Sequence, residues 1–261
     1  MTSDGGHPGG APEVVVSDRA EDLAASVARR LVRRLVELQH GGRVPSVVLT
    51  GGTIADQMHR ALLDVPERRE VDWSRTELWF GDERFVPEKD PQRNALHARE
   101  AFLSDLPVER ARVHEMPASD GPYGADVDAA ADAYAEELRR VLGPFPRFDV
   151  LMLGIGPDGH CASLFPHHEG LDATGLAVGV RDSPKPPPTR ISLTMPLLQQ
   201  AEEVWFMASG VGKAEAVRNA VSGADVRDVP AAGPKGRRRT LFLVDAEAAS
   251  QLRPSSRSPR R

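Results

Sequence analysis

The sequence predicts an α/β protein of three layers, in which helices cover both faces of a mainly parallel sheet. Short apolar runs of strand length alternate along the chain with helical patterns. The run Phe148–Leu153 is almost wholly apolar, as expected of a strand that is buried on both faces. The 261 residues, of which 40% are hydrophobic, are enough to bury a full core without disulfides.

The chain begins with a short apolar strand over Glu13–Val16, followed by a helix. Ser17 or Asp18 is expected to cap this helix, and the glycine pair 41–42 ends it. Its apolar positions recur every four residues and are Leu23, Val27, Leu31 and Leu35. This spacing predicts one buried face along the whole helix.

The remaining elements follow the same two patterns. Strands are expected at Ser46–Thr50, Thr76–Phe80, Arg112–Met116, Phe148–Leu153, Arg190–Met195, Val204–Ala208 and Leu241–Val244. Helices are expected at Thr53–Leu63, Asn94–Leu103, Ala125–Leu142 and Gly212–Val221, with a short helix after the last strand. The proline-rich residues 184–188 predict a rigid extended loop. We expect one domain over 13–252, with disordered tails at 1–12 and 253–261, the latter basic.

Composition excludes several classes of protein. Lys and Arg total 33 against 38 Asp and Glu, a net charge of −5, so no broad basic surface for nucleic acid is expected. The single cysteine, Cys161, excludes a disulfide framework and a cysteine-rich zinc site. The sequence contains no run of about 18 apolar residues, so no membrane helix is expected. Its N-terminus lacks the pattern of a signal peptide. We therefore expect a cytoplasmic protein with no membrane partner.

The first candidate segment is Thr50-Gly51-Gly52-Thr53, between an expected strand and an expected helix. Two glycines let backbone N–H groups approach a ligand closely, and the helix N-terminus adds partial positive charge. Together these features favour a phosphate site. The segment lacks the lysine of a P-loop and the spacing of a dinucleotide fingerprint, and a tight turn alone remains the alternative.

The second candidate segment contains Asp82, Glu83 and Arg84 directly after an apolar strand, with Asn94 further on. The arginine fork matches phosphate oxygens, and an acid beside it is expected to orient the guanidinium. A salt-bridged surface turn is the alternative.

The third candidate segment follows the buried strand and places Asp158 and His160 among three glycines. Histidine exchanges protons near neutral pH, and Asp158 can fix its tautomer; a purely structural pair is the alternative. Two cations, Arg190 and Lys213, fall where strand ends are expected to converge, so both can reach an anion, and ordinary surface charges are the alternative. Cys161 is interpreted as a packed thiol, and no third ligand accompanies the pair His167-His168, so neither a cysteine nucleophile nor a metal is expected.

Taken in order, these segments resemble the 6-phosphogluconolactonase family. The matching pieces are TGGT (50–53), WFGDERFVP (79–87) with Asn94, LGIGPDGHCASLFP (153–166), RISLTMPLL (190–198) and VWFMASGVGKAEAV (204–217). The resemblance covers roughly residues 13–250. It implies a fold shared with glucosamine-6-phosphate deaminases and ribose-5-phosphate isomerases, a Rossmann-like arrangement. Arg84 and the ending Leu164-Phe165-Pro166 favour the lactonase branch, whereas the first loop departs from the family pattern at Thr53-Ile54-Ala55.

The resemblance implies hydrolysis of 6-phospho-D-glucono-1,5-lactone to 6-phosphogluconate, the second step of the oxidative pentose phosphate pathway, without cofactor or metal. His160, with Asp158, would act as general base on a water molecule. The residues expected to bind the substrate are Gly51, Gly52, Thr53, Asp82, Arg84, Asn94, Arg190 and Lys213. The expected partner is a small phosphosugar lactone, and the chain is expected to be a monomer or a weak homo-oligomer. Two alternatives remain, namely an isomerase or deaminase of amino-sugar phosphates, and a sugar-phosphate-binding regulator without catalysis.

Overall fold

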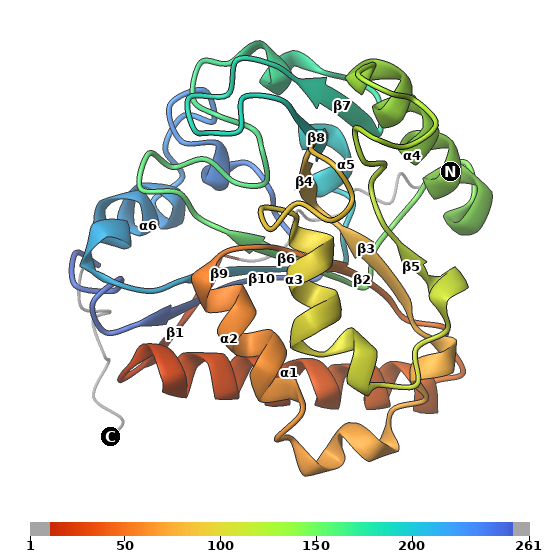
Figure 1. Ribbon diagram of the computed structural model, residues 1–261. Helices are drawn as coiled ribbons and strands as arrows, with labels where there is room; N and C mark the ends of the chain where they lie inside the picture. Colours follow the sequence, from red (N-terminus) through yellow and green to blue (C-terminus); the bar gives the residue numbers. More distant parts are fainter. Residues whose placement is uncertain (1–10, 253–261) are drawn as a thin grey trace, which may run out of the picture.

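The structure is a computed structural model that describes residues 11–252. Its centre is a seven-stranded sheet in the order β1-β10-β9-β6-β2-β3-β5, in which every neighbouring pair is parallel (Figure 1). The strands are β1 (Glu13–Ser17), β2 (Ser46–Leu49), β3 (Glu77–Phe80), β5 (Val113–His114), β6 (Val150–Gly154), β9 (Glu203–Ala208) and β10 (Arg239–Asp245). This sheet confirms the mainly parallel α/β fold expected from the sequence.

Helices cover both faces of this sheet, as the sequence predicts. One face carries α1 (Ala20–His40), α2 (Thr53–Leu62) and α3 (Asn94–Ala101). The other carries α4 (Val127–Leu142), α6 (Ala214–Val221) and the short α5 (Met195–Leu198). In Figure 1, α1 runs along one side of the strands and α4 and α6 lie on the opposite side.

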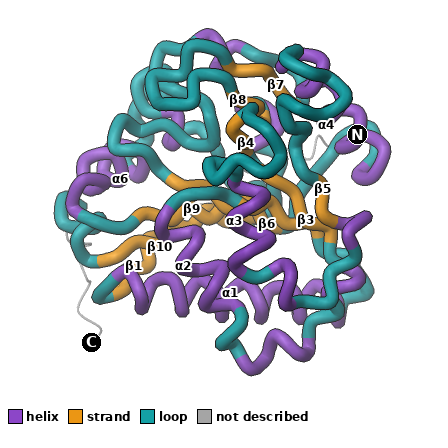
Figure 2. Tube along the Cα trace, in the orientation of Figure 1, coloured by secondary structure: helices purple, strands orange, loops and turns teal. Residues whose placement is uncertain are grey.

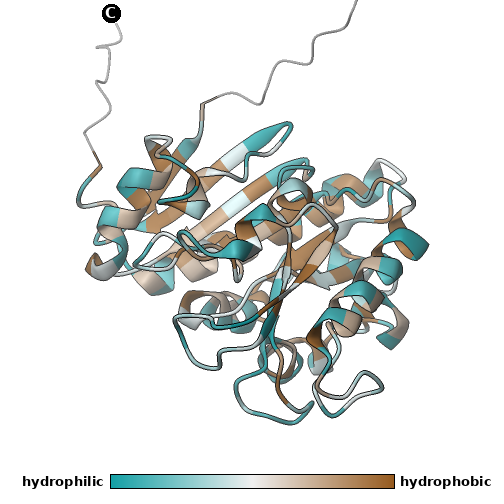
Figure 3. Ribbon diagram, turned by 90° about the horizontal axis from the view of Figure 1, so that it is seen from above, coloured by the Kyte–Doolittle hydropathy of each residue, from teal (hydrophilic) through white to brown (hydrophobic). Residues whose placement is uncertain are grey.

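The core is divided by the sheet because successive side chains of a strand point to opposite faces. In β9, Trp205 and Met207 pack toward α1–α3, whereas Val204 and Phe206 pack toward α4–α6. All six residues of β9 are buried, in keeping with the apolar run that follows Glu203 and faces both sides of the sheet. In Figure 3 the strands carry long apolar stretches, while the surrounding loops are largely hydrophilic.

A second, three-stranded sheet was not predicted. It joins β4 (Asp82–Arg84), β8 (Arg190–Leu193) and β7 (Ala177–Val180) by antiparallel pairing. The strand expected at Arg190–Met195 therefore exists in shortened form, but it lies outside the parallel sheet. Strand β4 was missed because it consists of three charged residues, whereas strands were predicted from apolar runs. The register places Arg84 opposite Arg190, so this small sheet brings together two cations that are far apart in the sequence.

Two local predictions were wrong. Helix α1 begins at Ala20 after Arg19, which makes no side-chain capping bond, because Ser17 pairs with Asp245 as the last residue of β1. No helix follows β10 within the described residues; the chain forms turns there, and the Asp245 carboxylate accepts a hydrogen bond from the Ala248 N–H at 2.8 Å.

The predicted tails fall almost entirely outside the described residues, which include only Ala11 and Pro12 of the N-terminal one. Within residues 11–252, no helix is long and apolar enough to cross a membrane. The loops that follow β2, β3, β6 and β9 gather along one edge of the large sheet (Figure 2). This edge holds the candidate site, as expected for the carboxyl ends of parallel strands.

Candidate active site

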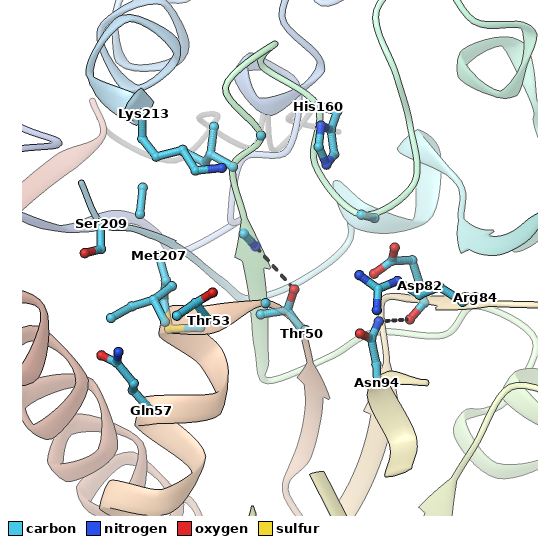
Figure 4. A pocket seen from close by; sticks show the side chains of 18 of the residues that line it. Thr50, Thr53, Gln57, Asp82, Arg84, Asn94, His160, Met207, Ser209 and Lys213 are labelled. Carbon is cyan, nitrogen blue, oxygen red and sulfur yellow. Dashed lines mark hydrogen bonds between the residues drawn. The ribbon is translucent and has the colours of Figure 1, made fainter. Parts of the chain in front are cut away.

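A pocket of about 490 Å³ opens at the carboxyl edge of the large sheet (Figure 4). Its walls come from the loops after β2, β6 and β9, the N-termini of α2 and α3, and the small sheet. The predicted site residues that line it are Gly51, Gly52, Thr53, Asp82, Arg84, Asn94, His160, Arg190 and Lys213. Asp158 is the one predicted site residue that is not in the wall.

The first loop needs its glycines for two different reasons. A Cβ atom on Gly51 would overlap the side-chain oxygen of Asn94, so no larger residue fits there. Gly52 has φ +103°, a left-handed conformation that favours glycine, and it precedes the first residue of α2. Helix α2 has no side-chain cap, so its first N–H groups and its positive end lie at the pocket wall. This arrangement supports anion binding.

Asp82 and Arg84 both line the pocket, although Glu83 between them points away from it. The Asp82 carboxylate accepts a hydrogen bond from the Ser163 hydroxyl at 2.6 Å. Arg84 Nη1 donates to the carbonyl of Gln92 at 2.5 Å. The expectation that a neighbouring acid orients the Arg84 guanidinium was therefore wrong, because a backbone carbonyl does so.

Glu83 is buried and holds the start of α3. Its carboxylate accepts hydrogen bonds from three backbone N–H groups, those of Arg84, Asn94 and Ala95, at 2.8–2.9 Å. Burial raises the pKa of Glu83, and nearby Arg93 and the three N–H groups act in the opposite direction. The consequence for the site is that Asn94 is fixed at the first position of α3.

The Asn94 side-chain amide is hydrogen-bonded through its nitrogen only. Its Nδ2 donates to the carbonyl of Asp82 at 3.0 Å, and its buried Oδ1 has no hydrogen-bond partner among the described residues. This oxygen is enclosed and faces Gly51, so the amide lies between the first loop and β4.

His160 and Asp158 form a close pair. His160 Nδ1 lies 2.5 Å from Asp158 Oδ1, and the imidazole also packs against the ring of Phe165 at 4.7 Å between centroids. The loop requires glycine at Gly156, since a Cβ there would overlap both side chains of the pair. Asp158 thus lies behind His160 and supports it.

A lysine that the sequence analysis did not single out completes this cluster. Lys185 Nζ lies 3.0 Å from Asp158 Oδ1 and 3.0 Å from His160 Nδ1. Burial alone would raise the pKa of Asp158, but its bonds to His160 and Lys185 hold that pKa well below the usual value. The carboxylate is therefore ionised and lies within hydrogen-bonding distance of His160 Nδ1.

Arg190 holds the proline-rich loop that carries Lys185. Its Nε donates to the carbonyl of Pro187 and its Nη2 to those of Lys185 and Pro186, at 3.0–3.2 Å. Burial lowers the pKa of Arg190, while Asp82 raises it. The guanidinium thus anchors the loop through Nε and Nη2. Its Nη1 makes no hydrogen bond within the described residues.

Lys213 precedes α6 and lines the pocket without an ion pair to any described residue. Burial and the charge of Lys185 lower the pKa of Lys213, and Asp158 opposes this change. Figure 4 shows Lys213 and His160 on one side of the pocket and Arg84, Asp82 and Asn94 on another. Cations therefore approach the space from several directions.

The remaining titratable neighbours do not join the site. Burial raises the pKa of the Cys161 thiol, which is fully enclosed. His168 Nε2 contacts the carbonyl of Arg181, and His167 lies beside Asp228. No group of three His, Cys, Asp or Glu residues within 11–252 is arranged to hold a metal ion.

The chain matches a known protein family over most of its length. The model of the family described as "Glucosamine-6-phosphate isomerases/6-phosphogluconolactonase" matches residues 18–243. The 6-phosphogluconolactonase of Streptomyces coelicolor is 52% identical over 247 residues, which are 92% of this chain and 95% of that protein. The 6-phosphogluconolactonase of Mycobacterium tuberculosis is 45% identical, with 88% and 94% covered.

Solved structures show the same fold. The 6-phosphogluconolactonase of Trypanosoma brucei aligns with a TM-score of 0.78 at 28% identity, over 93% of this chain and 99% of that one. A monomeric glucosamine-6-phosphate deaminase aligns with a TM-score of 0.74 at 20% identity, over 91% and 99% of the two chains. The second likeness concerns the fold alone.

Proposed function

We infer the function of this chain from the premise that it belongs to the glucosamine-6-phosphate isomerase/6-phosphogluconolactonase family. It is a hydrolase that opens the ring of 6-phospho-D-glucono-1,5-lactone to give 6-phosphogluconate, in the oxidative pentose phosphate pathway. Relatives that are 40–52% identical over most of the chain carry the lactonase name. The roles of individual residues are our proposal, and the observation that carries it is His160 in the wall of a cationic pocket, with Asp158 paired to it from behind.

His160 is the general base. Asp158 accepts a hydrogen bond from Nδ1–H in this proposal, so the lone pair of Nε2 takes a proton from a water molecule as the water oxygen attacks C1 of the lactone. The bond between C1 and the ring oxygen then breaks, and the ring oxygen takes the proton back from His160. The product is a carboxylic acid that ionises in water. An ester carbonyl is already electrophilic, so this route needs no covalent enzyme intermediate.

The phosphate is held at a distance from C1 by the segment Gly51–Thr53 at the N-terminus of α2, together with Arg84, Arg190 and Lys213. Several cations and helix N–H groups suit a dianion, and binding this remote group orients C1 over the base. Asp82 and Asn94 line the same pocket, and we assign them to contacts with the sugar. The loop departs from the family pattern at Thr53-Ile54-Ala55, but Thr53 still supplies a hydroxyl there.

The test compares two substrates with one preparation of the protein. Freshly made 6-phosphogluconolactone should be hydrolysed far above the spontaneous rate in a blank without protein, and glucosamine 6-phosphate should release no ammonia. Ammonia release without lactone hydrolysis would replace the lactonase with an amino-sugar deaminase. Thermal stabilisation by 6-phosphogluconate without hydrolysis would indicate a binding protein. A cytoplasmic location and a monomeric or weakly associated state remain predictions.

A further inference from the structure

A second pocket of about 380 Å³ lies at the opposite edge of the large sheet from the active site. Strand β9 connects the two, because its first residue, Glu203, lines this second pocket while Met207 and Ala208 line the first. The other wall is α1, which packs on this face of the sheet (Figure 1). The second pocket therefore shares no lining residue with the active site.

The lining is unusually basic for a chain with a net charge of −5. Six arginines stand against two glutamates. The arginines are Arg29, Arg30, Arg33 and Arg34 of α1, and Arg238 and Arg239 at the start of β10. Cations at spacings of three and four residues on a helix face repel one another, so this arrangement is unfavourable unless an anion is present.

The two glutamates leave most of this charge uncompensated. Glu203 is buried. Its carboxylate forms an ion pair with Arg34 Nε at 2.9 Å and accepts a hydrogen bond from the Trp205 indole N–H at 3.0 Å. Glu37 pairs with the same Arg34 at 3.1 Å. Both acids are thus engaged with one arginine.

Outside the pocket lining, two further acids contact the arginines. Glu13 pairs with Arg239 at 2.7 Å, whereas Glu67 is 3.8 Å from Arg33, and Arg238 is 4.0 Å from Glu203. Arg29 and Arg30 form no ion pair with any residue in 11–252. Several guanidinium groups with weak or no carboxylate partners therefore converge on one hollow.

We propose that this second pocket is a binding site for a small molecule that carries several phosphate groups. Guanidinium groups from two elements match the oxygens of adjacent phosphates with paired hydrogen bonds. A volume of about 380 Å³ accommodates a compact oligophosphate and is too small to enclose a macromolecule. The buried Glu203–Arg34–Trp205 contacts give the floor of the pocket a fixed shape.

Inorganic tripolyphosphate is the probe, and isothermal titration calorimetry is the measurement. Saturating 6-phosphogluconate is present throughout, so that the active-site cations are occupied. The wild-type chain should bind one equivalent, and orthophosphate should bind more weakly. The double variant Arg30→Gln/Arg238→Gln should bind tripolyphosphate at least roughly tenfold more weakly, since each lost charge-assisted hydrogen bond contributes on that scale.

The matched control is Arg110→Gln/Arg139→Gln, which removes the same charge from exposed arginines elsewhere. It should bind as the wild type does, and thermal unfolding should show that both double variants are folded. No binding by the wild type, or equal weakening in both double variants, would overturn the proposal, the latter by showing non-specific attraction. Binding of an oligonucleotide but not of tripolyphosphate would also overturn it. Neither variant touches residues of the lactonase site, so lactone hydrolysis is tested independently.

Discussion

Lys185 and His160 lie 3.0 Å apart, Nζ to Nδ1, and both contact the same carboxylate oxygen of Asp158. Twenty-five residues separate the two in sequence. Arg190 donates to the carbonyls of Lys185, Pro186 and Pro187 and so anchors the loop that carries this lysine. His160 is thus held by a carboxylate whose own charge is stabilised by an ammonium group from another part of the chain.

Removing this ammonium should slow catalysis more than it weakens binding. We expect Lys185→Met to lower kcat by about tenfold or more, as is usual for groups that orient a functional histidine, with a smaller change in KM. Steady-state kinetics on the lactone measure both values. Lys89→Met, at an exposed lysine, is the control. A Lys185→Met enzyme with unchanged kcat would show that the lysine has no positioning role.

Arg84 and Arg190 should differ in their effect on stability. Arg84→Gln and Arg190→Gln should each raise KM for the lactone strongly, because each removes a cation from the pocket. Arg190→Gln should also lower the free energy of unfolding by about 2 kcal/mol, since buried loop carbonyls lose donors. Urea unfolding and kinetics, with Arg139→Gln as the control, measure both effects. An unchanged KM in both variants would refute the phosphate clamp.

The first loop should not tolerate a methyl group. Gly51→Ala places a Cβ against Asn94 Oδ1, so either the loop or the amide must move. We expect KM to rise about tenfold or more while the protein stays folded, because both groups line the pocket. Gly175→Ala, where a Cβ meets only an ordinary contact, should behave as the wild type. Equal kinetics for both alanine variants would contradict the proposed fit.

Acid should destabilise the fold through His59, a buried residue of α2 that stacks on Phe102 and has no hydrogen-bond partner within the described residues. Burial, with smaller effects of Arg60 and His97, lowers the pKa of His59 to about 3. The unfolded chain therefore takes up a proton below pH ~6.5 that the folded chain does not. This contribution to stability is complete above that pH and falls by about 1.4 kcal/mol per pH unit as the pH drops toward 3.

The measurement is urea unfolding between pH 7.5 and about 4.5, compared with His59→Leu. The variant should lose less stability on acidification than the wild type, and His40→Leu, at an exposed position, should follow the wild type. Identical pH dependence of the wild type and His59→Leu would show that His59 takes up its proton equally in both states.

The sequence predicted those features that depend on local pattern. The spacing of Leu23, Val27, Leu31 and Leu35 identified the buried face of α1, because a helix repeats every 3.6 residues. The sequence also placed the three glycine-rich or charged segments correctly at the carboxyl edge of the sheet, because parallel strands end together. Features that depend on pairing between distant parts of the chain could not be predicted from the sequence. The small sheet follows from β4 meeting β8 across more than 100 residues, and the position of Lys185 follows from loop carbonyls that bind Arg190.

The most direct test of the account is the rate of lactone hydrolysis by His160→Ala, measured beside the wild type and a blank. We expect kcat to fall by about 10²–10⁴-fold, the usual contribution of a general base, with binding of 6-phosphogluconate nearly unchanged. Asp158→Asn should fall in the same direction, because it no longer fixes the Nδ1 proton. A His160→Ala enzyme that retains the wild-type kcat would contradict the assignment of His160 as the base.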